Sequence, residues 1–515
     1  MKHLPLILIL SGIAFAIVTR FVLPFPHVFS PLGIQLNTPD AYIMIRYADM
    51  FPYGIAWDWY SNWPDGQQPF HYTVFSFIIW SVSRIFNIST MQVGAILPPL
   101  IFLLTLMPVY AIARVLFNKM TAAVSVFALC LLPGEILHRT MLGAADYHCW
   151  EILLVSSYFA FLIYAIKSRT WFSVVAAAIT FAIYCLSWQG APIILLILAI
   201  SCLTVLFLLA DMEWKAIIGF GTVALTGLCA KLLPEIFPMH WYEFTGLFSL
   251  DLAQPVTEMQ SLFFTSGQFD MSVMFTYFGF TFWIALAGIG WMAYRVYKSH
   301  DTADIVFLAW SCVMLAITIC MRRFDYYFAV NGAILAAFVV VKVIQYTGRQ
   351  QAIRAAIVVA LVLCLPLAKQ SIMTGISDTG YMSPGWQKAV IWLQNQANDR
   401  LYYDGERPEY AVLSWWNNGY WITGAGHHAV TCDNGNQDNA GKTARLLMDD
   451  YSKSIWTLRH EHIKYVIIDK AMMTSSLYPI MHKADVADPA QSFMFQLYST
   501  APDWQFDEVK VYMIY

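Results

Sequence analysis

The segment VGAILPPLIFLLTLMPVYAIA, residues 93–113, contains no charged side chain. A helix of about twenty apolar residues is long enough to cross the hydrocarbon core of a bilayer. Segments of the same kind recur along the first 370 residues of the chain. The membrane spans that they predict are 4–22, 93–113, 120–136, 150–166, 171–187, 191–210, 215–234, 273–294, 303–320, 324–341 and 353–369. The sequence therefore predicts a polytopic α-helical membrane domain.

The overall composition supports a membrane protein. The 515 residues are 59% hydrophobic and 12% charged, whereas soluble globular proteins carry roughly 25% charged residues. In water, that much apolar surface would need a core larger than a single domain can form. The net charge of −3 gives no electrostatic reason to expect a nucleic-acid partner. The nine cysteines show no CxxC spacing, so no zinc-binding motif is expected.

Basic residues in the loops predict the orientation of the spans. The apolar segment 72–87 is short and carries three serines and Arg84, so we expect it to lie at the interface or to re-enter. The loops on one side of the membrane then carry Arg114, Lys119, Lys167, Arg169, Lys215, Arg295, Lys298, Lys342, Arg349 and Arg354. Because short cytoplasmic loops collect Lys and Arg, that side is predicted to be inside. A crossing by 72–87 would reverse this bias, which argues against a crossing.

The outer side receives the longer loops and the C-terminal part of the chain. The long outer loops are 23–92, 137–149 and 235–272. Residues 373–515 are polar and rich in turns, and they alternate helical periodicity with short β-branched runs at 411–414, 465–468 and 509–514. We therefore predict a transmembrane domain over 1–372, followed by a small mixed α/β extracytoplasmic domain over 373–515. The expected location is the cell (inner) membrane.

Three acidic positions fall in separate loops of the predicted outer face. They are Asp40, the pair Asp146 and His148, and Glu258. The D-x-H spacing allows two short side chains to converge on one cation, and carboxylates with few neutral ligands suit Mg²⁺ or Mn²⁺. Carboxylates gathered beside a bilayer repel one another, and a cation relieves that repulsion. The alternative for each residue alone is an ordinary polar loop position at the water interface.

Two arginines lie at the same predicted level of the membrane. Arg323, in MRRFDYY, begins an apolar helix, and Arg139 follows the exit of another span. The planar guanidinium group matches phosphate oxygens, so both arginines are candidates for binding a diphosphate. The alternative is an interfacial arginine that contacts lipid phosphate.

The soluble part contains the segment AVLSWWNNGYWI, residues 411–422. Adjacent tryptophans after a strand are often core residues. If exposed, Trp415 and Trp416 would form a rigid apolar wall for a small side chain such as Thr or Ser, with Asn417 supplying a hydrogen bond.

Five segments together resemble the catalytic subunits of oligosaccharyltransferases, of the bacterial or archaeal single-subunit type. WWNNGYWI resembles the WWDYG signature of that family, and RTMLGAADYH its D-x-D or D-x-H motif. DAYIMIRYAD is similar to its first acidic motif, PVTE to its external-loop motif and RRFDYY to its Arg-Phe helix start. The resemblance implies a membrane domain of the GT-C type. It also implies transfer of a glycan from a polyprenyl (di)phosphate carrier to the side-chain amide of Asn in N-x-Ser/Thr proteins.

The resemblance also implies roles for individual residues. Asp40 and Glu258 would hold the acceptor amide and contact a divalent metal, Mn²⁺ or Mg²⁺. Asp146 and His148 would be further metal ligands, and Arg323 would hold the phosphate of the carrier. With no separate nucleophile in view, the expected outcome is direct displacement with inversion at the anomeric carbon.

The acceptor-binding residues implied by the resemblance are Trp415, Trp416 and Asn417. Here the sequence departs from the family, because Asn417 stands where the family has Asp. An amide still forms hydrogen bonds with a hydroxyl, but charged hydrogen bonds are the stronger kind. Asp469 and Met472, in IIDKAMM, loosely match a second hydroxyl-binding motif of the family.

Three other functions fit parts of the pattern. A GT-C transferase acting on a hydroxyl, a lipid or a cell-wall glycan would share the metal and carrier residues but would need no hydroxyl-binding pocket. A transporter or flippase would place charges within the spans rather than in loops on one face. An inactive scaffold would need no metal.

Overall fold

The computed structural model describes residues 3–54, 57–69, 74–187, 257–265, 267–347, 351, 358–377, 381–396, 406–435 and 439–515. The chain forms two compact units. The first, which we call the helical unit, comprises Met1–Phe25, Pro98–Met141 and Tyr147–Ser377. The second, the mixed unit, comprises Pro26–Leu97, Leu142–Asp146 and Asp378–Tyr515.

Long apolar helices make up the helical unit. They are α1 (Leu4–Ile17), α5 (Thr90–Leu116, divided between the units at Pro98), α6 (Lys119–Leu131), α8 (His148–Ser168), α9 (Trp171–Ser187), α13 (Ser272–Phe278), α14 (Thr281–Ser299), α15 (Thr302–Cys320), α16 (Asp325–Tyr346) and α18 (Leu365–Ile376). Among the described residues, five helices are long and apolar enough to cross a membrane, and a sixth span results if the bent pair α13 and α14 is counted. These helices confirm the multi-pass membrane domain. The expected spans 191–210 and 215–234 lie outside the described residues.

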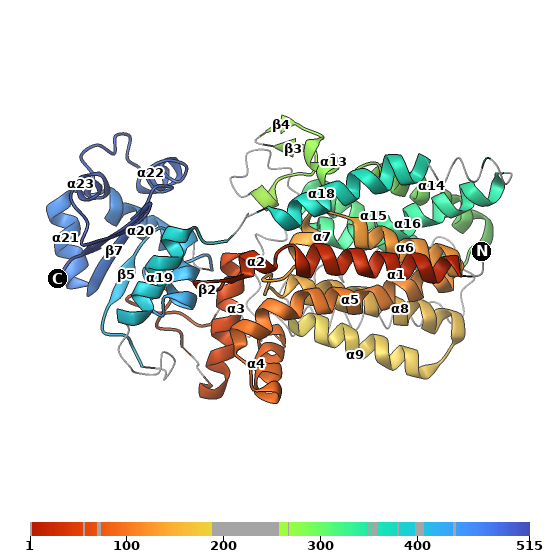
Figure 1. Ribbon diagram of the computed structural model, residues 1–515, viewed down its shortest axis with the longest axis horizontal. Helices are drawn as coiled ribbons and strands as arrows, with labels where there is room; N and C mark the ends of the chain where they lie inside the picture. The colour runs from red at the N-terminus through yellow and green to blue at the C-terminus, as the bar shows by residue number, and fades with distance from the viewer. Residues whose placement is uncertain are drawn as a thin grey trace. The chain divides into compact units, whose positions relative to one another are not determined.

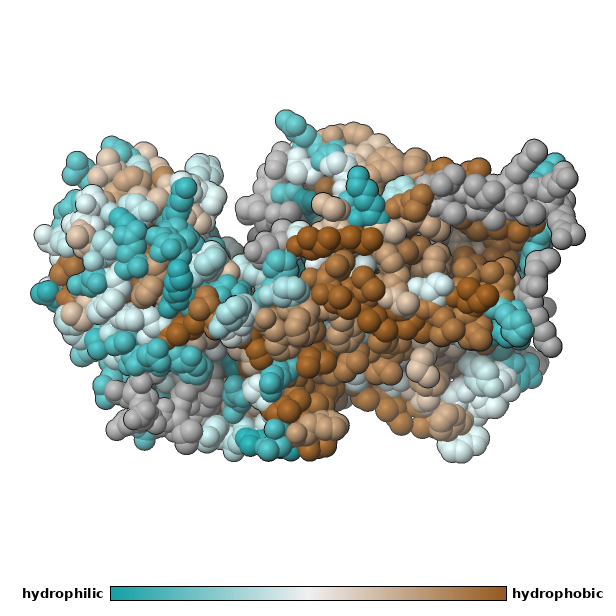
Figure 2. All heavy atoms as spheres, in the orientation of Figure 1, coloured by the Kyte–Doolittle hydropathy of each residue, from teal (hydrophilic) through white to brown (hydrophobic). Residues whose placement is uncertain are grey.

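The centre of the helical unit is α16. Every residue from Asp325 to Phe338 is buried, and α6, α14 and α15 pack against this helix. Helices nearer the outside of the unit expose apolar side chains, such as Leu10 on α1 and Trp171 on α9. Figure 2 shows strongly hydrophobic residues as brown patches over the helices. Apolar side chains on this scale are stable in contact with lipid and costly in water.

A five-stranded sheet lies at the core of the C-terminal part of the mixed unit (Figure 1). Its strand order is β6 (Ala429–Val430), β5 (Ala411–Leu413), β7 (Ile463–Asp469), β9 (Val509–Met513) and β8 (Trp504–Phe506). β5 pairs in parallel with β6 and β7, whereas β9 is antiparallel to β7 and β8. The helices of this part are α19 (Pro384–Gln396), α20 (Ala440–Met448), α21 (Tyr451–His460), α22 (Leu477–Ala484) and α23 (Phe493–Ser499). This sheet with its helices confirms the predicted mixed α/β part.

The mixed unit also contains the first long loop of the chain. This loop carries α3 (Pro39–Met50) and α4 (Val74–Phe86). Backbone hydrogen bonds from Trp63 N to Val430 O (2.9 Å) and from Val430 N to Tyr60 O (2.9 Å) attach it to β6. α4, which occupies most of the segment 72–87, has 13 residues and is shorter than the roughly twenty that a span requires. That the segment 72–87 does not cross stays a prediction.

Candidate active site

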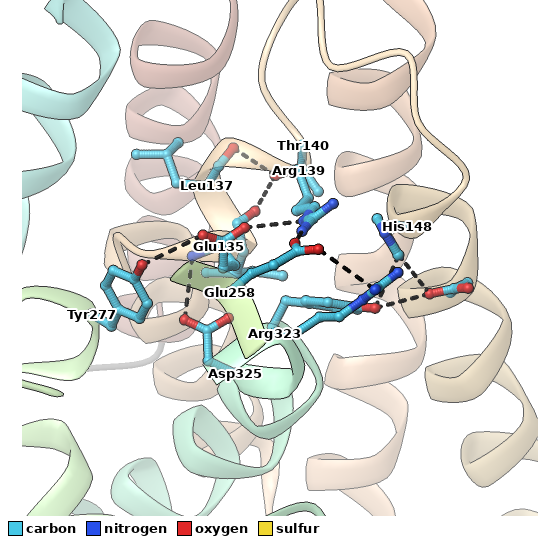
Figure 3. Close-up of polar contacts among 12 residues, drawn as sticks. Glu135, Leu137, Arg139, Thr140, His148, Glu258, Tyr277, Arg323 and Asp325 are labelled. Atoms are coloured by element: carbon cyan, nitrogen blue, oxygen red, sulfur yellow. Dashed lines mark hydrogen bonds and ion pairs between the residues drawn. The ribbon is translucent and has the colours of Figure 1, made fainter. Parts of the chain in front are cut away.

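A cluster of two arginines and two glutamates lies in the helical unit. The Arg139 guanidinium group donates to Glu258 Oε2 (2.6 Å) through Nη2 and to Glu135 Oε2 (3.0 Å) through Nε. Arg323 Nη1 lies 3.5 Å from Glu258 Oε1. Figure 3 shows the Glu258 carboxylate between the two guanidinium groups. We call these four residues the arginine cluster.

Short elements at the ends of long helices position the arginine cluster. Glu135 begins α7 (Glu135–His138), whose start is fixed by Gly134 at φ +77° and by a bond from Glu135 N to Asp325 Oδ2 (3.3 Å). Arg139 follows directly after α7. A positive φ favours glycine, which allows the chain to turn abruptly into α7.

The other side of the cluster is a pair of 3₁₀ turns, η3 (Thr257–Met259) and η4 (Arg322–Phe324). Arg322 N donates to Gln260 O (2.9 Å), and Ser261 Oγ donates to Ile319 O (2.7 Å). These bonds fasten the residues after Glu258 to the end of α15, directly before Arg323. Residues far apart in sequence are therefore held at one place by the backbone.

The two arginines determine the charge state of Glu258. Burial acts to raise the pKa of its carboxyl group, but Arg323 and Arg139 outweigh burial, and the pKa lies below its ordinary value. The side chain keeps 34% of its surface exposed. Glu258 is therefore ionised at neutral pH, and the site that holds it is built to bind an anion.

His148 begins α8 and belongs to a second buried network of the helical unit. Its Nδ1 lies 3.0 Å from Glu151 Oε2 and 3.0 Å from the Tyr326 hydroxyl. The hydroxyls of Tyr326 (3.0 Å) and Tyr327 (3.1 Å) both donate to the same Glu151 oxygen. Glu151, Tyr326 and Tyr327 are not among the site residues predicted from the sequence. They could have been identified in the sequence because each is a polar side chain within a predicted apolar span.

Asp40 and Asp146 both lie in the mixed unit. Asp40 is in the first turn of α3, whose N-cap Thr38 accepts a hydrogen bond from Ala41 N (3.2 Å). Asp146 is buried at the end of the loop 142–146, and Asn37 N donates to Gly143 O (3.1 Å) in that loop. This bond joins the segment before Asp40 to the loop that ends at Asp146.

The predicted metal ligands divide between the units. Asp40 and Asp146 belong to the mixed unit, whereas His148 and Glu258 belong to the helical unit. Within the described part of the chain, no group of three or more His, Cys, Asp or Glu side chains is close enough to hold a metal ion. The donor set of carboxylates and one imidazole fits Mn²⁺ or Mg²⁺ chemically, and the complete ligand set stays a prediction.

Residues 414–422 of the mixed unit, which we call the aromatic segment, follow β5. Trp415 is 2% exposed and packs in a core cluster with Trp63 and Leu447, so it takes the core position that the sequence left open. Trp416 and Asn417, which begin η6 (Trp416–Asn418), are half-buried. Trp421, later in the segment, is half-buried as well. Trp416 and Asn417 therefore keep some surface to offer an acceptor.

Asp469, at the end of β7, braces this aromatic segment. Its Oδ2 accepts from Asn418 Nδ2 (3.4 Å) and from Trp386 Nε1 (2.8 Å), and its Oδ1 accepts from Met472 N (2.8 Å). Asn418 also donates to Ser414 Oγ (3.2 Å). The loosely predicted pair Asp469 and Met472 is thus buried beside the aromatic segment, and Asp469 holds its Asn418 side chain.

Comparison with known proteins shows which proteins this chain resembles in sequence and in fold. Residues 53–252 match the family model described as oligosaccharyl transferase STT3, N-terminal. The dolichyl-phosphooligosaccharide-protein glycotransferase 3 of Archaeoglobus fulgidus is 24% identical over 92% of this chain and 70% of its own length.

Two solved structures of archaeal relatives share the fold. The oligosaccharyltransferase AglB from Archaeoglobus fulgidus, in complex with an inhibitory peptide and a dolichol-phosphate, matches with a TM-score of 0.79 at 20% identity, covering 94% of this chain and 71% of that one. The Archaeoglobus fulgidus oligosaccharyltransferase in complex with zinc and sulfate matches with a TM-score of 0.74 at 19% identity, covering 93% and 70%. With its apolar spans and its C-terminal α/β part, the chain shares the GT-C membrane fold of these oligosaccharyltransferases and is similar to them along most of its length.

Proposed function

We propose that this chain transfers a glycan from a polyprenyl (di)phosphate carrier to the side-chain amide of Asn in N-x-Ser/Thr acceptor proteins, with Mn²⁺ or Mg²⁺ bound. The observation that carries the proposal is the arginine cluster, in which two guanidinium groups converge on one anion. A relative with this fold has been solved with a dolichol-phosphate and a peptide. Those ligands are the two kinds of substrate that the proposed reaction needs.

The donor phosphate binds at Arg139 and Arg323 in this proposal. A phosphate presents the same kind of oxygen atoms that the Glu258 carboxylate now presents to them. Donor and Glu258 therefore compete for the guanidinium groups. When the donor binds, the Glu258 carboxylate becomes available for the acceptor amide.

The acceptor step uses carboxylates because an amide nitrogen is a poor nucleophile. Asp40 and Glu258 accept hydrogen bonds from the two N–H groups of the Asn side chain and hold it twisted or polarised. The bond from the anomeric carbon to the amide nitrogen forms as the bond to the phosphate oxygen breaks, and a carboxylate takes the amide proton. The result is inversion at that carbon.

A divalent ion held by Asp40, Asp146 and His148, with Glu258 as a further ligand, would stabilise the charge that develops on the leaving phosphate. A relative's complex with zinc and sulfate supports such an ion. Arg323 adds a fixed positive charge at the same place.

In this proposal, the aromatic segment binds the acceptor. Trp416 and Asn417 offer an apolar wall and an amide to the Ser or Thr hydroxyl, above the core residue Trp415. Residues 373–515 would then form an extracytoplasmic domain, and residues 1–372 the catalytic membrane domain of an inner-membrane enzyme.

The test is transfer by the purified chain from a polyprenyl-linked glycan to peptides. We expect glycosylation of an Asn-x-Thr peptide, loss of transfer to the matched Asn-x-Ala peptide, and loss of transfer on chelation with recovery by Mn²⁺. Equal transfer to both peptides, or transfer only to a lipid or glycan hydroxyl, would instead support the alternative GT-C transferase.

A further inference from the structure

Glu151 is a fully buried carboxylate that the proposed reaction leaves without a role. Its exposed fraction is 0%, and it lies one turn after His148 on α8. An acidic side chain inside an apolar span is costly, so its retention calls for strong local partners. One Glu151 oxygen has three such partners, in His148, Tyr326 and Tyr327.

The geometry around Glu151 defines which nitrogen of His148 carries the proton. The carboxylate oxygen accepts hydrogen bonds, so His148 Nδ1, 3.0 Å away, is the protonated nitrogen. In that tautomer, the lone pair on Nε2 is the one that can bind a metal ion. Two further bonds to the same Glu151 oxygen come from the neutral phenols of Tyr326 and Tyr327, which help to hold the carboxylate beside the imidazole.

Resting on the proposed metal-dependent function, we propose that Glu151 is the positioning residue of the metal site. It orients the His148 ring and fixes the tautomer that presents Nε2 to the divalent ion. Carboxylates in this position also make the imidazole a more basic ligand.

The tyrosines connect this positioning residue to the arginine cluster. Tyr326 and Tyr327 lie in the first turn of α16, directly after the 3₁₀ turn that carries Arg323. The Tyr184 hydroxyl lies 2.8 Å from the Tyr327 hydroxyl and extends the network to α9. The Arg139 guanidinium carbon is 5.9 Å from the centre of the Tyr326 ring. One helix start therefore supports both the phosphate-binding arginine and the orientation of the metal ligand.

The test is Mn²⁺ affinity of the full-length chain in detergent, measured by the electron paramagnetic resonance signal of free Mn²⁺. Glu151→Gln keeps the size of the side chain and removes its charge. We expect this variant to bind Mn²⁺ about 10- to 100-fold more weakly than the wild type. In transfer assays, the Mn²⁺ concentration for half-maximal rate should rise by a similar factor, while kcat at saturating Mn²⁺ should largely recover.

A double-mutant cycle separates positioning from a general structural role. In a His148→Ala background, Glu151→Gln should cause no further loss of Mn²⁺ affinity, because the ligand that it positions is gone. Asp304→Asn is the matched control, since Asp304 is another buried carboxylate of the helical unit and pairs with Arg295 (2.8 Å). This control should leave Mn²⁺ affinity unchanged even if it lowers Tm.

The outcomes distinguish this inference from the proposed function. Wild-type affinity in Glu151→Gln, or an equal further loss in the His148→Ala background, would overturn the role of Glu151 while leaving metal dependence intact. Absence of Mn²⁺ binding by the wild type would overturn both. If Glu151→Gln does not fold, Tyr326→Phe retains the carboxylate and should weaken Mn²⁺ binding at the low end of the range, about tenfold; unchanged affinity in that variant would contradict the inference.

Discussion

In the proposed function, the arginine cluster and the aromatic segment after β5 would recognise their ligands by opposite means. The cluster holds partly exposed charges, and both oxygens of Glu258 face guanidinium groups. The aromatic segment holds no charge of its own, and its Asn418 is braced from beneath by the buried Asp469. In the first region electrostatic attraction selects the ligand, and in the second the shape of a packed surface does. The proposal therefore keeps both phosphate-binding arginines at the donor end, whereas Asn417 replaces a charged residue at the proposed acceptor end.

The largest effect is expected from Glu258→Gln. The variant loses the carboxylate that would hold the acceptor amide, so kcat should fall by at least about 100-fold. Binding of the donor lipid should stay the same or tighten, because Arg139 and Arg323 lose an anion that competes for them. Kinetics and donor binding with purified protein measure both, with the exposed Glu409→Gln as the matched control. Transfer within tenfold of wild type would break the assigned role of Glu258.

Arg323→Gln should act on the donor rather than on the acceptor. A charged hydrogen bond contributes about 1.5–3 kcal/mol, so the KM for the donor should rise about 10- to 150-fold. The KM for the acceptor peptide should change little. Raising the salt concentration should weaken donor binding in the wild type more than in the variant, because screening acts on the charge that was removed. An unchanged donor KM would contradict a phosphate-binding role.

Asn417→Asp tests the neutral side of the comparison. Restoring a charged acceptor of hydrogen bonds should raise kcat/KM for Asn-x-Thr peptides about fivefold, corresponding to about 1 kcal/mol. The matched Asn-x-Ala peptide serves as the control and should show no gain. Equal gains for both peptides would mean that position 417 does not contact the hydroxyl residue.

The smallest effect is a difference in pH dependence between two carboxylates. Burial acts to raise the pKa of Glu258, but Arg323 and Arg139 lower it below the ordinary value for a glutamate. The stabilisation from these ion pairs is therefore present above the ordinary pKa. It is lost as the pH falls through the lowered pKa of the folded protein. Burial and the neighbouring Asp58 raise the pKa of Asp433, in the mixed unit, to about 6, against the opposing effects of a hydrogen bond from Ser61 and the positive charge of Arg46. The contribution of Asp433 to the stability of the folded protein is therefore fully present below the ordinary pKa of an aspartate, and it is lost as the pH rises through about 6.

Thermal unfolding of matched variants measures this contrast. The Tm of the wild type relative to Glu258→Gln should be highest at neutral pH and should fall below about pH 4.5. The Tm of the wild type relative to Asp433→Asn should fall as the pH rises from 4 to 7. Parallel pH curves for the two pairs would show that the two environments do not differ as described.

Local sequence pattern predicts the elements of this fold well. The run 93–113 lies within α5, and the β-branched runs 411–414, 465–468 and 509–514 overlap β5, β7 and β9. The expected span 120–136 ends early, at Leu131, because Pro133 and the positive φ of Gly134 break the helix.

The site is harder to predict, because its contacts join distant parts of the chain. The position of Arg139 at a span exit made it a phosphate-binding candidate, but nothing local indicates that Glu258, 119 residues away, is its partner. Glu151 meets Tyr326 across 175 residues in the same way. Trp415 and Trp416 are identical and adjacent, and only tertiary packing decides that the first is core and the second half-buried.

Mass spectrometry of glycopeptides from cells with and without this chain tests the central claim most directly. The account predicts glycans on Asn side chains of N-x-Ser/Thr sequences that disappear when the chain is deleted and return with the wild type but not with Glu258→Gln. Unchanged Asn-linked glycans after deletion, accompanied by loss of sugar from a lipid or a hydroxyl-linked glycan, would contradict it.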